Sequence, residues 1–144
     1  IKYYMSEITA SGCLFYAKST KRFLFLHRNL KQKGTWGLVG GISVDTETPW
    51  QGLKREITEE IGFNPSITKT IPLELFVSRD TKFKFHTFVC VVESEFVPKL
   101  NPEHSGYAWV SVNQWPLPLH EGVKKSLNSK QIKTKLQTIL DLIV

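Results

Sequence analysis

Three glutamates between residues 56 and 60 have a spacing suited to metal-assisted chemistry. Glu56, Glu59 and Glu60 are spaced i, i+3 and i+4, so they share one face of a helix that turns about 100° per residue. Like charges at this spacing repel each other and cost free energy. A divalent cation relieves that repulsion, and Mg²⁺ or Mn²⁺ prefers carboxylate oxygens as ligands. The trio therefore indicates a metal site, with a solvated acidic face as the alternative.

The flanking residues predict the helix that would carry these acids. Thr46 or Thr48 suits the N-cap, and Pro49 suits the first turn, where its missing N–H costs nothing. Gly62 stands where a helix commonly ends. We expect an apolar stripe beside the acidic face to pack on the core, and it comprises Trp50, Leu53, Ile57 and Ile61.

The acids also belong to a longer pattern. Gly41, Glu47 and the run from Arg55 to Phe63 match G-x5-E-x7-R-E-U-x-E-E-x-G-U, the Nudix box, in which U is a bulky apolar residue. The chain resembles a Nudix hydrolase. The resemblance implies an α/β fold, an α/β/α sandwich with a mixed β-sheet, and a single domain over residues 1–144. Val39 and Thr46 depart from the proline and glycine frequent in the family, without removing a ligand.

The resemblance also implies an activity. Nudix hydrolases use a divalent metal to cleave the pyrophosphate bond of a nucleoside diphosphate linked to another moiety, as in nucleoside triphosphates, dinucleoside polyphosphates and nucleotide sugars. Pyrophosphate is highly anionic, so a cation is needed to let a nucleophile approach phosphorus. Two alternatives are a Nudix domain that binds nucleotide or RNA without turnover, and an RNA-end pyrophosphohydrolase.

Site roles follow from the resemblance, position by position. The expected metal ligands are Glu56, Glu59 and Glu60 together with the backbone carbonyl of Gly40, and either Glu56 or Glu60 would be the general base. Arg55 would orient a glutamate, Glu47 or Glu56, through a charge-assisted bond.

A further metal ligand is expected from a loop beyond the box. Glu103, six residues before Trp109, is our first choice, and Glu93 and Glu95 compete with it. We interpret His104 and His120 as ordinary surface or turn histidines rather than bases.

The sequence indicates the residues that touch the substrate less specifically than it indicates the metal ligands. They are Gly41, Trp36, Glu47, Arg28 and Tyr107, and further aromatic residues that would stack on a base are Phe76, Phe85 and Trp115. The proline-marked signature of ADP-ribose hydrolases is missing, because Ser78 occupies its position. The run from Glu103 to Trp109 resembles segments of nucleotide-sugar and dinucleoside-polyphosphate hydrolases. A purine nucleotide is the first substrate we expect.

Composition limits the partners and the cellular location that we expect for the protein. The chain has 144 residues and a formal net charge of +6, but its lysines are scattered without interleaved aromatics, so nucleic acid is an unlikely partner. No apolar run is long enough to span a membrane, and no signal-peptide pattern opens the chain. Isolated Cys13 and Cys90 indicate reduced core thiols and a cytoplasmic location. A homodimer remains open.

The remaining elements are predicted from hydrophobic periodicity. Beyond the helix after Pro49, a helix is expected at about 130–143, with a shorter one at 120–127. A loop is expected over 93–106. Strands are expected over 3–8, 12–17, 22–27, 36–39, 67–77, 82–92 and 107–112, and Gly40-Gly41 would release the chain from the fourth of these strands into the loop of the box.

Overall fold

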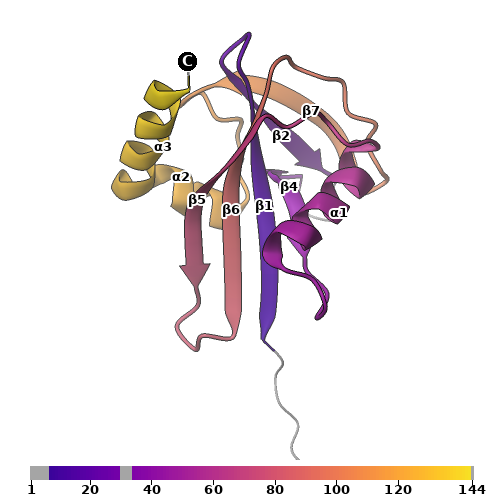
Figure 1. Ribbon diagram of the computed structural model, residues 1–144, viewed down its shortest axis with the longest axis vertical. Coiled ribbons are helices and arrows are strands. Elements are labelled where there is room, and N and C mark those ends of the chain that lie inside the picture. The colour runs from indigo at the N-terminus through magenta and orange to yellow at the C-terminus, as the bar shows by residue number, and fades with distance from the viewer. Residues whose placement is uncertain (1–6, 30–33, 144) are drawn as a thin grey trace, which may run out of the picture.

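The computed structural model describes residues 7–29 and 34–143, and it contains one mixed sheet with helices on both faces (Figure 1). The strands are β1 (Ile8–Ala17), β2 (Arg22–Arg28), β3 (Trp36–Gly37), β4 (Val39–Ile42), β5 (Lys69–Val77), β6 (Phe83–Val92) and β7 (His104–Ser111). The helices are α1 (Pro49–Ile61), α2 (Glu121–Asn128) and α3 (Lys130–Leu142). None of the helices in the described residues is long and apolar enough to cross a membrane.

Strand β1 is the centre of the sheet. The main strand order is β3-β2-β1-β6-β5, with β4 also paired to β1 and β7 to β2. Strands β1 and β6 run parallel, from Ile8 opposite Phe83 to Ala17 opposite Val92, and the other pairs are antiparallel. The predicted mixed sheet is confirmed.

Side chains that alternate along β1 and β2 divide the core into two layers. Leu14 and Phe25 face the layer under α2 and α3, whereas Phe15 and Leu24 face the layer under α1. This is the period-two alternation of a strand buried on both sides. The predicted α/β/α sandwich is therefore confirmed.

Helix α1 is fixed at both ends by local chemistry. The Thr48 hydroxyl accepts the Gln51 N–H, and the Gln51 side chain accepts the Thr48 N–H in return, which forms a capping box. At the other end Gly62 adopts a left-handed conformation with φ 86°, and its N–H donates to the Thr58 carbonyl. Of the two predicted caps, Thr48 is the one used.

Several predicted boundaries are wrong. The expected strand over 36–39 is two short strands, β3 and β4, and β4 runs through Gly40 and Gly41 instead of releasing the chain there. The strand expected over 12–17 begins at Ile8, and most of the strand expected over 3–8 lies outside the described residues. Strand β7 begins at His104 rather than residue 107, because it pairs with the full length of β2.

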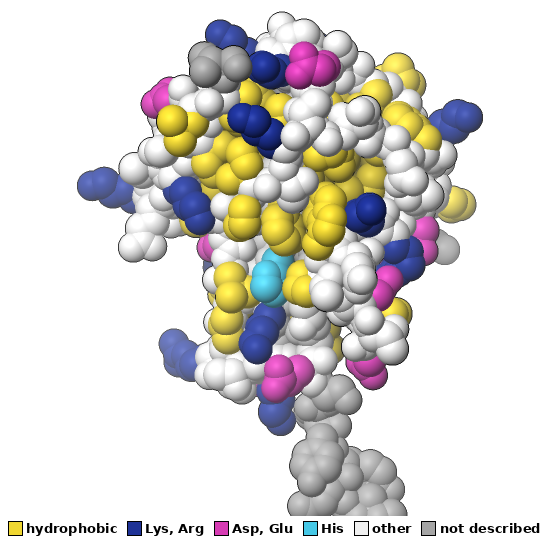
Figure 2. All heavy atoms as spheres, viewed as in Figure 1, with side chains coloured by type: hydrophobic (Ala, Val, Ile, Leu, Met, Phe, Trp, Pro, Cys, Tyr) yellow, Lys and Arg dark blue, Asp and Glu magenta, His cyan; other side chains and the backbone are white. Residues whose placement is uncertain are grey.

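The surface over β5 and β6 is apolar and is not covered by a helix on the α1 side. In the space-filling view, hydrophobic side chains gather over β5 and β6 between α1 and the α2–α3 pair, with lysine and arginine side chains around them (Figure 2). Helix α1 contacts β1 and β4 and leaves this part of the sheet uncovered.

Truncating a buried residue of α1 tests how much the packing of this helix contributes to the free energy of unfolding. Leu53 is fully buried between α1 and the sheet, so Leu53→Ala should lower the free energy of unfolding by about 2 to 5 kcal/mol. The measurement is urea unfolding followed by circular dichroism. Lys54→Ala, at the exposed neighbouring position, is the matched control and should change stability by less than about 0.5 kcal/mol. Equal effects of the two changes would contradict this packing.

Candidate active site

Arg55 is the central charge of the acidic face of α1. Its Nε and one Nη donate to the two carboxylate oxygens of Glu47 at 2.8 and 3.1 Å, which is a bidentate pair. Its other Nη donates to Glu59 at 3.2 Å and to Glu56 at 3.4 Å. The bonds to Glu47, and then those to Glu59, raise the pKa of Arg55, so it stays charged. Arg55 therefore orients the acids on both sides of it.

Glu47 connects the loop before α1 to this network. It accepts the Val44 N–H at 2.9 Å besides the two Arg55 bonds, and the hydrogen bond from Arg55 is the main reason why its pKa is lowered. The Arg55 Nη that binds Glu47 also donates to the Ile42 carbonyl at 3.0 Å. Arg55 and Glu47 thus fix the loop between β4 and α1, and every oxygen of Glu47 is used within the protein.

Glu60 is the buried acid of the site, with only 7% of its surface exposed. Its Oε1 accepts the backbone N–H of Gly40 at 2.8 Å. Burial, together with the charges of Glu56 and Glu103, raises the pKa of Glu60 to about 8, although the Gly40 hydrogen bond and the charge of Arg28 oppose the rise. A buried carboxylate with two acidic neighbours is a place where added positive charge is favourable.

Glycines let α1 approach β4 closely enough to form this site. A Cβ on Gly41 would collide with the Glu56 carboxylate, and a Cβ on Gly40 would overlap the backbone of Ser11 on β1. Burial, followed by the charge of Glu59, raises the pKa of Glu56, and Arg55 partly offsets this. Gly41 therefore serves the site by making room for Glu56, and Gly40 by donating its N–H to Glu60.

Among the competing loop acids, Glu103 is the one whose charge acts on Glu60. Its carbonyl accepts the Asn29 N–H at 3.0 Å, which holds it at the end of β2. Glu95 instead binds Arg22 at 2.6 and 2.8 Å at the other end of β2. The Glu93 carbonyl accepts the Ser19 N–H near that same end.

The donor set suits a hard divalent cation, although the acids are not gathered around a single point. In the described part of the chain, no three His, Cys, Asp or Glu side chains converge as a metal centre. Arg55 explains this arrangement, because it holds Glu47, Glu59 and one oxygen of Glu56 in hydrogen bonds. The charges of Glu56 and Glu103 both act on Glu60, and carboxylate oxygens are donors that fit Mg²⁺ or Mn²⁺.

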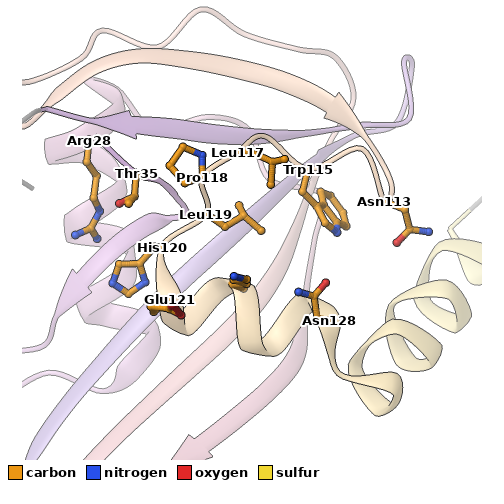
Figure 3. A pocket seen from close by; sticks show the side chains of 11 residues that line it. Arg28, Thr35, Asn113, Trp115, Leu117, Pro118, Leu119, His120, Glu121 and Asn128 are labelled. Carbon is orange, nitrogen blue, oxygen red and sulfur yellow. The ribbon is translucent and has the colours of Figure 1, made fainter. Parts of the chain in front are cut away.

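A large cavity has Arg28 in its lining. It has a volume of about 1110 Å³ and is formed by the 113–120 segment, α2 from Glu121 to Asn128, and residues Arg28 and Thr35 (Figure 3). Arg28 connects the cavity to the acids, because its charge acts on Glu60 and also on His120 in the cavity lining. Asn113, Trp115 and Asn128 lie at the end of the cavity away from Arg28 in Figure 3.

The sequence did not single out His120 as part of this cavity. His120 caps the N-terminus of α2 and is half-buried, and burial, followed by the charge of Arg28, lowers its pKa. Lys124 lies one turn further along α2 and also lines the cavity. The only sequence feature that pointed to this cavity was the break between the 107–112 strand and the 120–127 helix, because a loop there is able to fold back over the sheet.

The predicted aromatic wall is only partly present. Trp115 lines the cavity, but Trp36 instead packs against His27 with the ring centroids 4.8 Å apart and tilted by 58°, and its backbone bonds to Pro118 and His120. Trp36 therefore holds the cavity loop. Tyr107 lies on β7, 39% exposed, and does not line the cavity. Phe76 and Phe85 pair with each other across β5 and β6 and are also absent from the cavity lining.

The raised pKa of Glu60 predicts how stability depends on pH without metal. Between pH 4.5, the ordinary pKa, and about 8, the folded state keeps a proton that the unfolded state has lost. Stability should therefore fall as pH rises through this window, by roughly 2 to 5 kcal/mol in total. Urea unfolding at several pH values, with chelator present, measures the effect.

Glu60→Gln is the control for this pH dependence. Glutamine keeps an oxygen that can accept the Gly40 N–H but does not ionise, so its stability curve should be flatter over the same window. Parallel curves for the two proteins would show that Glu60 is not the group responsible.

Comparison with known proteins gives the same assignment as the geometry. The family profile described as "NUDIX domain" matches residues 7–129. A dihydroneopterin triphosphate diphosphatase of Haemophilus influenzae is 32% identical over 138 residues, covering 85% of this chain and 84% of that protein. A putative 8-oxo-dGTP diphosphatase 3 of Mycobacterium tuberculosis is also 32% identical, covering 85% of this chain and 61% of that protein.

A solved structure supports the same fold. The crystal structure of RenU, a Nudix hydrolase from M. smegmatis, superposes with a TM-score of 0.75 at 23% identity, covering 100% of this chain and 91% of that one. The family match spans both the acidic helix and the segment that forms the cavity. The chain therefore belongs to the Nudix family and is one of its pyrophosphohydrolases.

Proposed function

We propose that this enzyme cleaves a pyrophosphate bond in the triphosphate chain of a substrate whose heterocycle occupies the cavity beyond Arg28. The observation that supports this most directly is the position of Arg28, which lines the cavity and whose charge also acts on Glu60. A cation attracted by the acids, a phosphate chain attracted by the guanidinium and an organic group in the cavity would then belong to one substrate site.

The metal would be Mg²⁺ or Mn²⁺, held by Glu56, Glu59, Glu60 and Glu103 with help from the Gly40 backbone. When bound, such an ion neutralises phosphate charge and lowers the pKa of a bound water. The chain's own residues do the positioning. The Gly40 N–H fixes Glu60, and Arg55 holds Glu59 and one oxygen of Glu56. We propose Arg55 as a positioning residue, with Glu56 or Glu60 as the general base.

The substrate class is suggested by the relatives together with the cavity. The two relatives are named for dihydroneopterin triphosphate and 8-oxo-dGTP. Both molecules carry a triphosphate and a fused ring with a 2-amino-oxopyrimidine edge. Asn113 and Asn128 line the cavity, and each amide offers both a donor and an acceptor for such an edge. We therefore propose a pterin or guanine-type triphosphate as substrate.

A cytoplasmic location goes with this function in our proposal. Both cysteines are free and buried, which suits a reducing compartment. Burial raises the pKa of Cys13 well above its usual range, so this thiol is unreactive.

A substrate panel tests the proposal. Dihydroneopterin triphosphate, 8-oxo-dGTP, dGTP, ATP, a diadenosine polyphosphate, ADP-ribose and triphosphorylated RNA are assayed with Mg²⁺ and with Mn²⁺. We expect the highest kcat/KM for one of the first three, with pyrophosphate and a monophosphate as products and no turnover in chelator. A clear preference for RNA, ADP-ribose or the diadenosine compound would reject the proposed substrate class but not the family assignment.

Removing the charge of Glu60 should abolish turnover without unfolding the protein. Glu60→Gln is expected to lower kcat by several orders of magnitude, because the amide is a poor metal ligand and no base, while its shape still fits beside Gly40. Kinetics with the best substrate of the panel give the effect, and circular dichroism confirms folding. Near-normal kcat in a folded variant would refute a catalytic role.

Lys124 should affect binding rather than chemistry. Lys124 lines the cavity, so Lys124→Ala is expected to raise KM roughly three- to tenfold with kcat little changed, as for a part-exposed charge contributing about 1 kcal/mol. Lys125→Ala is the matched control, because Lys125 is the exposed neighbour that does not line the cavity. If both variants keep the KM of the parent, the substrate does not extend along α2.

A further inference from the structure

Strand β5 ends the sheet with an open edge. The main strand order stops at β5, and none of the other described strands pairs with its outer side. The Ser78 N–H donates to the Phe83 carbonyl at 2.8 Å, so alternate residues before it, Val77 and Leu75, direct their N–H and C=O groups away from β6. A row of this kind is a ready template for another strand.

The same edge carries apolar side chains on both faces. Leu75, Phe76 and Val77 are consecutive and are 54%, 49% and 41% exposed. Leu75 pairs with His86 across the sheet, and Phe76 pairs with Phe85, so Leu75 and Phe76 lie on opposite faces. Figure 2 shows hydrophobic side chains extending over β5 on the face of the sheet that α1 covers at β1 and β4. A partner that binds this edge must therefore contact side chains on both faces of the sheet, as an added strand does.

The charges near the edge fit an antiparallel copy of the same strand. Between Thr70 and Val77 the only charged residue is Glu74, whose carboxylate accepts the Ser126 hydroxyl on α2 and is thereby directed away from the edge. Lys69 stands at one end of β5. Asp80 stands in the turn beyond the other end, where it accepts the Ser78 hydroxyl at 2.7 Å and the Lys82 N–H at 3.0 Å.

We propose that β5 pairs antiparallel with β5 of a second copy around a two-fold axis, which makes one continuous sheet through a homodimer. Pairing centred on Leu75 sets leucine against leucine and Leu73 against Val77, and it brings Lys69 of each copy opposite Thr81 of the other, next to Asp80. Strands β6 and β1 separate this edge from β4 and the acids that lie against it.

Sedimentation equilibrium tests the proposal with the purified chain. The parent should have twice the 16.5 kDa mass of one chain, and a Phe76→Lys/Val77→Lys variant should be monomeric, because a lysine would replace an apolar side chain on each face of the sheet at the joined edges. Val97→Lys is the control, since Val97 is 72% exposed in a loop away from β5, and it should stay dimeric. Hydrolase activity per chain should be unchanged in all three, which also shows that they fold. A parent that is monomeric at every concentration, or a double variant that remains dimeric, overturns the proposal.

A cysteine cross-link tests the pairing independently of those charged variants. Leu75→Cys should form an interchain disulfide under mild oxidation, seen as a reducible dimer on a denaturing gel, because the two copies of residue 75 face each other. Val97→Cys should not, and the native Cys13 and Cys90 are both buried. A failure of Leu75→Cys to cross-link contradicts the register, and equal cross-linking of the control shows only random collision.

Discussion

The close approach of helix α1 to strand β4 is the constraint on which the rest of the site depends. Gly40 and Gly41 leave no side chain between the strand and the helix, so the Glu56 carboxylate lies against Gly41 and the Glu60 carboxylate receives the Gly40 N–H. Any larger residue at Gly41 would occupy the position of the Glu56 carboxylate. The packing of Leu53, Ile57 and Ile61 into the core holds this approach in place.

Bringing acids so close together has an electrostatic cost, and Arg55 offsets only part of it. Arg55 satisfies Glu47 completely and shares its remaining donors between Glu56 and Glu59. Glu60 receives no such partner and is the most buried of the group, which is why its pKa rises most. The clustered acids therefore lower the stability of this region, but they make the binding of a cation and a phosphate chain favourable, as is common at active sites.

The family assignment and the substrate rest on different parts of the chain. The box residues lie in one continuous segment, from Gly41 on β4 to Phe63 just after α1, and they indicate what the enzyme does to a phosphate chain. The cavity is assembled from the ends of β2 and β3, the 113–120 segment and α2, which are far apart in sequence. Trp36 connects these parts, because its backbone bonds to Pro118 and His120 hold the cavity loop against β3. Changes in that loop would alter the substrate without touching the acids.

The sequence alone determined the parts that depend on local chemistry. Hydrophobic periodicity placed α1, α3 and most strands, the capping residues fixed the ends of α1, and the spacing of Glu56, Glu59 and Glu60 put them on one face of that helix. Only the tertiary structure decided which distant residues meet. It placed Glu103 at the end of β2, where its charge acts on Glu60, and it paired Glu95 with Arg22 at the other end. It also made Gly40 and Gly41 strand residues, moved Trp36 and Tyr107 out of the cavity lining, and brought His120 into it. Local pattern specifies the face of an element, but contacts across the sheet depend on register and on loops folding back, and these are set by the packing of the whole chain.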